Sequence, residues 1–525
     1  EVKPIDFDAI ERRLEEIRKG GTQDLFEYHF RNIILEKIPP LVKQARIMSQ
    51  KYDVVVTNPP YMGNRGMNGK ISQYVSNNYP YSKLDLFAVF IEKSIKYTRN
   101  YVALITQQSW MFLSSYERLR NKILNNRIIN LVHLGSKAFE EIKGEKVKTA
   151  SFVISKINND DAKPKFIKLT KYNNHIQKEK EFFKIDNHYS NLKQSDFRQI
   201  QGCPIAYWIS EITLKIFQEG KNFENIIDLT GSQHITADNE KYLREFWEIS
   251  YSDMGKKWIT YAKGGTFRKW YGNLSLVVDW SEEAKKFYRE NSTSNMLDKK
   301  YWFREGITWT ATTTSKFSCR LLPPTGVFDK KGPSLFLLKE SMTKFYMGFM
   351  NSAVVNYLLE LFSESQDYQN IDIKRLPVID FNETLIDDVT SIVDENIKIS
   401  ESDWNSFETS WNYKKHPLLT HKDNSAIIEQ AFNNWSSFVE KQFNQLKTNE
   451  EELNRIFIEI YGLQGELIPE VEDKDVTIRK ADRVRDIKSF ISYAVGCMFG
   501  RYSIDVEGLI YAGGDFKDKW KNENG

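Results

Sequence analysis

Residues 52–61 carry the sequence YDVVVTNPPY, in which a short β-branched run ends abruptly at Asn58-Pro59-Pro60-Tyr61. The run predicts a β-strand, and three more short strands follow it, with helical patterns between the first three. The expected strands are 53–57, 101–106, 128–134 and 149–155, and the expected helices are 84–97 and 116–124. Alternation at this spacing predicts a parallel α/β sheet. The last two strands lack room for a helix between them and should pair antiparallel.

The four residues after the first strand suit one particular chemistry. Open α/β sheets place ligands at the carboxyl ends of their strands. There the Asn58 amide oxygen and the Pro59 carbonyl can accept both N–H bonds of an exocyclic amine, which draws its nitrogen towards a more nucleophilic geometry. Prolines fix the backbone and remove competing donors, and Tyr61 offers a ring face to an extruded base. The alternative interpretation is an ordinary Pro-Pro turn in which the asparagine bonds locally.

The segment 52–156 resembles N6-adenine DNA methyltransferases of the gamma arrangement. Four segments occur in the family's order: 52–61, 83–93, 101–110 and 131–152. The resemblance implies that Asn58, Pro59, Pro60 and Tyr61 are catalytic and that Phe90 lines the adenine of S-adenosylmethionine. It also implies that Phe139 stacks on the flipped base. A core position is the alternative for Phe90.

Two residues in this segment have structural interpretations. Phe152 alternates with apolar neighbours in its expected strand, which favours a core position. His133 lies within another expected strand and has no acid or nucleophile at matching spacing. We therefore expect His133 to be a buried histidine whose ring nitrogens are satisfied by hydrogen bonds.

The glycine-rich turn that such enzymes use for their cofactor is not found before Asn58. Residues 1–50 are predicted to be helical, with an interruption at Pro39-Pro40. In the gamma order the cofactor motif lies upstream of residues 52–61. The resemblance therefore implies an incomplete S-adenosylmethionine site in this chain, which should bind the cofactor weakly and be inactive alone.

A basic and aromatic stretch, residues 255–274, stands out in the middle of the chain. It contains no acid. Its cations are Lys256, Lys257, Lys263, Arg268 and Lys269, and its rings include Trp258 and Trp270. Cations neutralise phosphates and rings support base or backbone contacts, so the stretch predicts a DNA-binding surface. The alternative is that the rings build a local core while the cations solvate a strand face.

Composition limits the other possibilities. Lys plus Arg number 74 against 71 Asp plus Glu, a net charge of +3, so any DNA-binding surface must be local. Cys203, Cys319 and Cys497 have no metal-ligand spacing and form no disulfide framework, and we expect no metal site. No apolar run approaches the ~18 residues of a membrane span. The expectation is a cytoplasmic protein with no membrane partner.

The resemblance extends over residues 20–515 to the PglX family of adenine methyltransferases from BREX phage-defence systems. The segments that carry it are 236–248, 303–309, 351–377, 403–411 and 493–502. It implies site-specific methylation of double-stranded DNA, with other defence-system proteins as partners. One departure is Ala237, because Thr236-Ala237-Asp238-Asn239 stands where related recognition domains favour Thr-Gly-Asp-Asn.

The predicted architecture combines α/β and α+β parts. A helical segment (1–50) precedes the C-terminal half of a Rossmann-like methyltransferase sheet (51–160). A mixed target-recognition domain (161–380) and a helical C-terminal domain (381–525) follow. Two alternatives stay open for the function. One is a non-catalytic DNA-binding or assembly module of the defence complex, and the other is a fragment of a fused restriction–modification enzyme.

Overall fold

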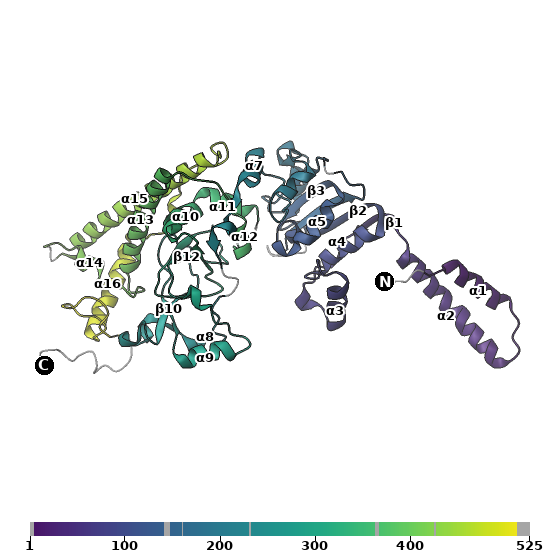
Figure 1. Ribbon diagram of the computed structural model, residues 1–525, viewed down its shortest axis with the longest axis horizontal. Coiled ribbons are helices and arrows are strands. Elements are labelled where there is room, and N and C mark those ends of the chain that lie inside the picture. The colour runs from purple at the N-terminus through teal and green to yellow at the C-terminus, as the bar shows by residue number, and fades with distance from the viewer. Residues whose placement is uncertain are drawn as a thin grey trace. The chain divides into compact units, whose positions relative to one another are not determined.

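The computed structural model describes residues 5–140, 147–159, 161–229, 233–362, 367–424 and 427–511. The chain divides into two compact units, Glu1–Trp208 and Ile209–Gly525, both of mixed α/β structure (Figure 1). Among the described residues, no helix combines the length and apolar character that a membrane crossing requires.

The first unit begins with two helices, α1 (Phe7–Lys19) and α2 (Leu25–Ser49). Asp24 caps α2, because its side chain accepts hydrogen bonds from the next backbone N–H groups. The predicted helical character is confirmed, but the predicted interruption at Pro39-Pro40 is wrong, since α2 runs through both prolines. Two prolines remove only two of the N–H donors of this long helix.

A six-stranded sheet follows, in the order β1-β2-β4-β3-β5-β6. Its strands are β1 (Tyr52–Thr57), β2 (Thr98–Gln107), β3 (Arg127–Gly135), β4 (Thr149–Ser155), β5 (Lys165–Lys168) and β6 (His188–Tyr189). The predicted pairing is confirmed: β1 and β2 are parallel, and β4 is antiparallel to β3. The sheet continues past residue 160, where the sequence placed a domain boundary, because β5 pairs with β3.

The edge strand β1 is exposed. In the described residues it pairs with β2 alone, and Val54 and Val56 are 52% and 72% exposed. Its neighbour β2 alternates buried and partly buried residues over its second half, as a strand inside a sheet does. An apolar parallel strand is ordinarily covered on both faces, so β1 departs from the usual pattern.

Four helices accompany this sheet: α3 (Gly69–Asn78), α4 (Leu86–Tyr97), α5 (Glu117–Leu124) and α6 (His175–Phe182). Helix α4 begins at Asp85, whose side chain accepts from the backbone N–H of Phe87 at 3.2 Å. Phe87, Ala88 and Ile91 of α4 are fully buried, which anchors the helix to the sheet.

The second unit contains two four-stranded sheets, β14-β10-β11-β9 and β13-β12-β15-β8, and the pair β16-β7. Their strands are β7 (Lys221–Asn222), β8 (Ile227–Asp228), β9 (Leu243–Glu245), β10 (Trp258–Ala262), β11 (Leu276–Asp279), β12 (Gly306–Trp309), β13 (Cys319–Leu322), β14 (Gly326–Phe328), β15 (Ser334–Leu337) and β16 (Pro377–Val378). Rings such as Tyr261, Trp280 and Tyr288 fill the core beside β10 and β11.

Helices gather beyond residue 380, as the sequence predicts. The helices of this unit are α7 (Glu211–Glu219), α8 (Asn239–Tyr242), α9 (Glu282–Glu290), α10 (Thr343–Met350), α11 (Ala353–Glu360), α12 (Asn370–Lys374), α13 (Glu383–Asn405), α14 (Pro417–Thr420), α15 (Ile428–Ile460) and α16 (Arg483–Met498). The long α15 packs against α11 and α13, and α13 packs against α10 (Figure 1).

Ala237 takes the backbone conformation that a glycine would take there. Its φ is +62°, in the left-handed region that favours glycine. The turn is held on both sides, because Thr236 Oγ1 donates to Asn239 Oδ1 at 2.8 Å and Asp238 caps α8. The departure from Thr-Gly-Asp-Asn therefore keeps the turn and adds backbone strain.

Candidate functional site

The Asn-Pro-Pro-Tyr loop begins directly after β1, at the carboxyl end of that parallel strand. Asn58 and Pro60 are exposed, Pro59 is buried, and Tyr61 is half-buried. The register pairs Thr57 with Leu104, so the loop lies beside the carboxyl end of β2, which ends at Gln107. An exposed amide and a fixed main chain thus stand together at the edge where such sheets bind ligands.

The loop is fastened to the start of α4. Met62 donates its N–H to Asp85 Oδ1 at 3.0 Å and accepts from the Leu86 N–H at 3.1 Å, while the Asn64 N–H donates to the Leu84 carbonyl at 2.9 Å. Burial raises the pKa of Asp85, against the lowering effect of the backbone N–H groups of Phe87, Met62 and Leu86. Three hydrogen bonds thus hold the backbone of the residues that directly follow the motif. The sequence analysis did not identify Asp85 as the residue that holds this backbone.

Tyr61 is held by its ring. The ring meets Phe87 edge-on, with centroids 6.2 Å apart at 84°, and Phe87 in turn meets Tyr116 at 5.8 Å. The Tyr61 hydroxyl is buried and has no hydrogen-bond partner among the residues that the structure describes. Burial raises its pKa to about 12, so the phenol stays neutral and does not serve as a base near pH 7.

Two rings were expected to contact ligands: Phe90 the cofactor and Phe139 the flipped base. They lie in different parts of the first unit. Phe90 is half-buried on α4, between residues that are almost fully buried. Phe139 is half-buried in the segment that follows β3 at the carboxyl edge. Both have surface left for a ligand, and their assigned roles stay predictions.

A buried polar network lies behind the sheet edge. His133 is fully buried, and its Nδ1 and Nε2 lie 3.0 Å from Tyr207 Oη and 2.9 Å from Gln108 Oε1. Burial is the main cause that lowers its pKa to about 3, and nearby lysines contribute. The prediction of a satisfied structural histidine is confirmed. Phe152 is also confirmed as core, because it is fully buried against Trp110.

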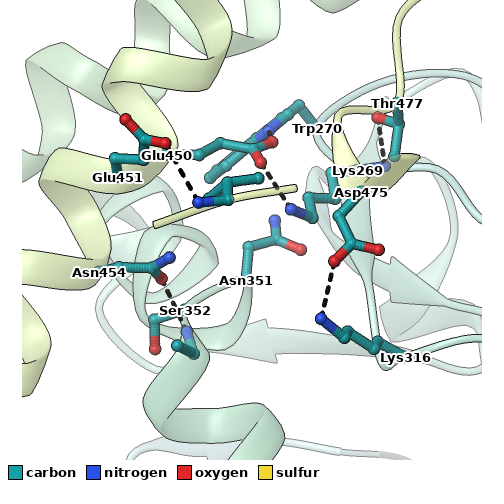
Figure 2. A network of polar contacts seen from close by, with 12 residues as sticks. Lys269, Trp270, Lys316, Asn351, Ser352, Glu450, Glu451, Asn454, Asp475 and Thr477 are labelled. Carbon is teal, nitrogen blue, oxygen red and sulfur yellow. Dashed lines mark hydrogen bonds and ion pairs between the residues drawn. The ribbon is translucent and has the colours of Figure 1, made fainter. Parts of the chain in front are cut away.

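Of the six residues expected to bind DNA in the basic stretch, three are buried in the interior of the second unit. They are Arg268, Lys269 and Trp270. Arg268 Nη2 is 2.7 Å from Asp403 Oδ2 on α13, and Lys269 Nζ is 2.6 Å from Glu450 Oε2 on α15. Trp270 Nε1 donates to the other oxygen of Glu450 at 2.7 Å. Figure 2 shows Lys269 and Trp270 pointing toward the Glu450 carboxylate.

The prediction that Arg268, Lys269 and Trp270 contact DNA is therefore corrected. These side chains are at most a tenth exposed, and acids from helices distant in the sequence already neutralise both cations. Desolvated ion pairs of this kind cannot reach a phosphate without breaking. The alternative, in which rings of the stretch build a local core, fits Trp258, Tyr261 and Trp270, all of which are buried.

The other three cations of the stretch have different positions. Lys256 and Lys257 are exposed just before β10, and Lys263 is half-buried just after it. Burial is the main cause that lowers the pKa of Lys263. DNA contact by these three lysines stays a prediction.

The part of the chain described before β1 forms α1 and α2, so it contains no strand with a glycine turn after it. Contact between Phe90 and S-adenosylmethionine stays a prediction. No group of three or more His, Cys, Asp or Glu side chains in the described part of the chain could hold a metal ion.

The chain is similar to a family of methylases and to two adenine-specific methyltransferases. The family model described as Eco57I restriction-modification methylase matches residues 3–139. The chain is 39% identical over 504 residues to the adenine-specific methyltransferase PglX of Lacticaseibacillus casei (strain Zhang). It is 35% identical over 503 residues to the adenine-specific methyltransferase BrxX of Escherichia coli O9:H4 (strain HS).

The two relatives match most of this chain, but this chain matches less than half of each relative. The matches cover 91% and 90% of this chain but only 42% and 40% of the two relatives. Among solved structures, the type IIL restriction-modification enzyme MmeI in complex with DNA aligns at TM-score 0.46 and 11% identity, over 84% of this chain and 57% of that one. The predicted resemblance to the PglX adenine-specific methyltransferases is confirmed over nine-tenths of the chain, which spans about two-fifths of their length.

Proposed function

We propose that this chain carries the amine-holding loop and the target-recognition part of an N6-adenine DNA methyltransferase. The observation that carries the proposal is the Asn-Pro-Pro-Tyr loop, fastened by Asp85, Met62 and Asn64 at the carboxyl end of a parallel strand. The similarity to two adenine-specific methyltransferases supports the same reaction.

The loop acts on the adenine amino group by accepting its hydrogen bonds. The target base must leave the DNA stack before its N6 can be reached. The Asn58 side-chain oxygen and the Pro59 carbonyl then accept the two N–H bonds, which pulls the nitrogen lone pair out of conjugation with the ring. Because the loop is already fixed, little reorganisation is needed as charge develops. Tyr61, a neutral phenol held by Phe87, contributes its ring rather than a proton.

S-adenosylmethionine would supply the methyl group when bound. In this proposal the six-stranded sheet is the C-terminal half of a methyltransferase sheet, and Phe90 forms the wall for the cofactor's adenine. The exposed apolar edge strand β1 suits this arrangement, because a further strand would pair with its backbone and the helix of that added unit would cover the face that carries Val54 and Val56. Cofactor binding by the 525 residues alone should be weak, no tighter than about 100 μM.

The second unit would select the DNA sequence. The mixed sheets of residues 209–380 form its recognition part, and the helices beyond residue 380 support them through the buried pairs Arg268–Asp403 and Lys269–Glu450. In this proposal the partners are double-stranded DNA and other proteins of a phage-defence system.

Methylation sequencing of host DNA, with and without the complete gene product, tests the proposed reaction. We expect N6-methyladenine at one recurring sequence only when the gene is expressed. Unchanged adenine methylation would contradict the proposal. It would favour instead a non-catalytic DNA-binding or assembly role.

A further inference from the structure

The residues that follow the Asn-Pro-Pro-Tyr motif leave the sheet and then return to the motif. Residues 62–84, which we call the α3 segment, contain a short turn of 3₁₀ helix at Asn64–Gly66 and then α3. The two ends of the segment meet, because Gly63 and Asp85 form an antiparallel β-bridge. Figure 1 shows α3 away from the strands of the sheet, on the side of α4. The base of the α3 segment is therefore joined directly behind Tyr61.

A small apolar core fastens the α3 segment to α4. Val75 and Tyr79 of the segment are buried in one cluster with Val89 of α4. The Ser82 hydroxyl, near the end of the segment, donates to Glu92 Oε2 of α4 at 2.6 Å. Because it is held both at its base and along α4, the α3 segment has a fixed place beside the motif.

The α3 segment contains cations but no acid. Between Asp53 and Asp85 the sequence has 31 residues without Asp or Glu, although the whole chain has 71 acids in 525 residues. The cations of the segment are Arg65, Lys70 and Lys83, and all three side chains are exposed. No ion pair, hydrogen bond or ring contact joins these three side chains to residues that the structure describes. Their charges are therefore open to an anionic ligand.

The acids of the two helices that flank the α3 segment already have partners. Asp85, at the start of α4, accepts from backbone N–H groups. Glu92 of α4 pairs with Lys122 of α5. Glu117, at the start of α5, is half-buried and has a partner of its own. Residues 141–146, outside the described ranges, hold two acids and two lysines and so add no net charge.

We propose that Arg65, Lys70 and Lys83 bind backbone phosphates of double-stranded DNA, so that the α3 segment holds the duplex beside the flipped adenine. This inference rests on the proposed function, because it assumes a DNA substrate at Asn58. Arginine and lysine bind phosphates through charge and counterion release, without reading the bases. The α3 segment therefore positions the duplex and leaves sequence selection to other residues.

The geometry favours the α3 segment over the buried part of the basic stretch. Its three cations are exposed, whereas Arg268 and Lys269 are paired with acids inside the second unit. Gln73 and Asn77, also exposed on α3, add neutral amides of the kind that donate to phosphate oxygens. Because the base of the segment is bonded directly behind the motif, a phosphate bound there stays close to the base that Asn58 receives.

The test measures DNA binding by the 525-residue chain as a function of salt. One variant replaces the three cations of the α3 segment with Gln. The matched control replaces Arg127, Lys163 and Lys165 with Gln, which removes the same charges from exposed side chains at the amino ends of β3 and β5. A fluorescein-labelled DNA duplex of random sequence is titrated by anisotropy between about 50 and 200 mM salt.

We expect the triple variant of the α3 segment to flatten the slope of log K against log salt by up to about 2.7 units, about 0.9 for each lost phosphate contact. The control should keep the slope of the unaltered chain, and all three proteins should share one melting temperature. If the triple variant melts earlier, Lys70→Gln alone decides the matter, with an expected change in slope of about 0.9.

Equal slopes for the α3-segment variant and the control would overturn the inference, as would absence of DNA binding by the unaltered chain. Host-DNA methylation tests the proposed function separately. Methylated host DNA together with equal slopes would therefore contradict phosphate binding by the α3 segment alone and leave the proposed function standing.

Discussion

The two ends of the basic stretch, residues 255–274, have similar cationic character in the sequence but different surroundings. Lys256 and Lys257 are exposed, whereas the side chains of Arg268 and Lys269 are 7% and 10% exposed. The acids that neutralise the latter pair, Asp403 and Glu450, lie 135 and 181 residues further along the chain. A local run of cations therefore does not reveal whether distant acids have already matched it.

The difference also separates two roles for charge. A cation paired inside a protein fixes the position of two segments, while a cation at an open edge can attract an anionic ligand. In the second unit, the paired cations join residues 268–271 to α13 and α15. The predictions below test whether the two roles are divided in this way.

The largest expected effect is on the stability of the second unit. Glu450→Gln leaves Lys269 buried without its counter-charge, which should cost about 3–5 kcal/mol of unfolding free energy. Asp475→Asn is the matched control, because its partner Lys316 is 58% exposed, and it should cost no more than about 1 kcal/mol. Urea denaturation measures both. Similar small losses for the two variants would mean that the buried pair does not join the segments.

A smaller effect on stability is expected when the pH falls, and it comes from His133 in the first unit. His133 has a folded pKa of about 3, so below the unfolded value of about 6.5 only the unfolded chain takes up its proton. Stability is therefore lost as pH falls from about 6.5 towards 3, by about 2–3 kcal/mol at pH about 4.5.

His133→Gln removes this titration while an amide can still bond to Gln108 or Tyr207. The variant should be less stable at pH about 7.5, and the gap to the unaltered chain should narrow as the pH falls. Thermal unfolding across pH measures the gap. A constant gap would show that His133 is not neutral in the folded unit. The basic stretch has no histidine and should add no such dependence.

The smallest effect is expected from the exposed end of the basic stretch. Replacing Lys256 and Lys257 with Gln should leave the melting temperature unchanged, because both side chains are exposed. If they contact phosphates as predicted, the salt slope of DNA binding should fall by up to about 1.8 units. An unaltered slope would make the whole stretch structural.

The sequence predicted the sheet of the first unit well because its signals are local. Strand–turn and strand–helix alternation over residues 52–155 depends on neighbours in the chain, and β1 to β4 lie where this pattern indicates. The sequence predicted that hydrogen bonds satisfy the buried His133 ring. It could not identify the partners Gln108 and Tyr207, since Tyr207 lies 74 residues away.

The sequence failed where distant segments decide the outcome. Arg268 and Lys269 resemble phosphate ligands until Asp403 and Glu450 are placed beside them.

The central claim is that the loop after β1 performs methyl transfer by holding the adenine amino group. The most direct measurement is the methylation rate and DNA affinity of the complete gene product with Asn58→Ala, compared with Asn64→Ala in the same loop. Asn58→Ala should lower the rate by about 10²–10³-fold with unchanged DNA affinity. Asn64→Ala should leave the rate nearly intact, because its side chain bonds only to Ser72 in the described structure. Full methylation by Asn58→Ala, or an equal loss in Asn64→Ala, would contradict the claim.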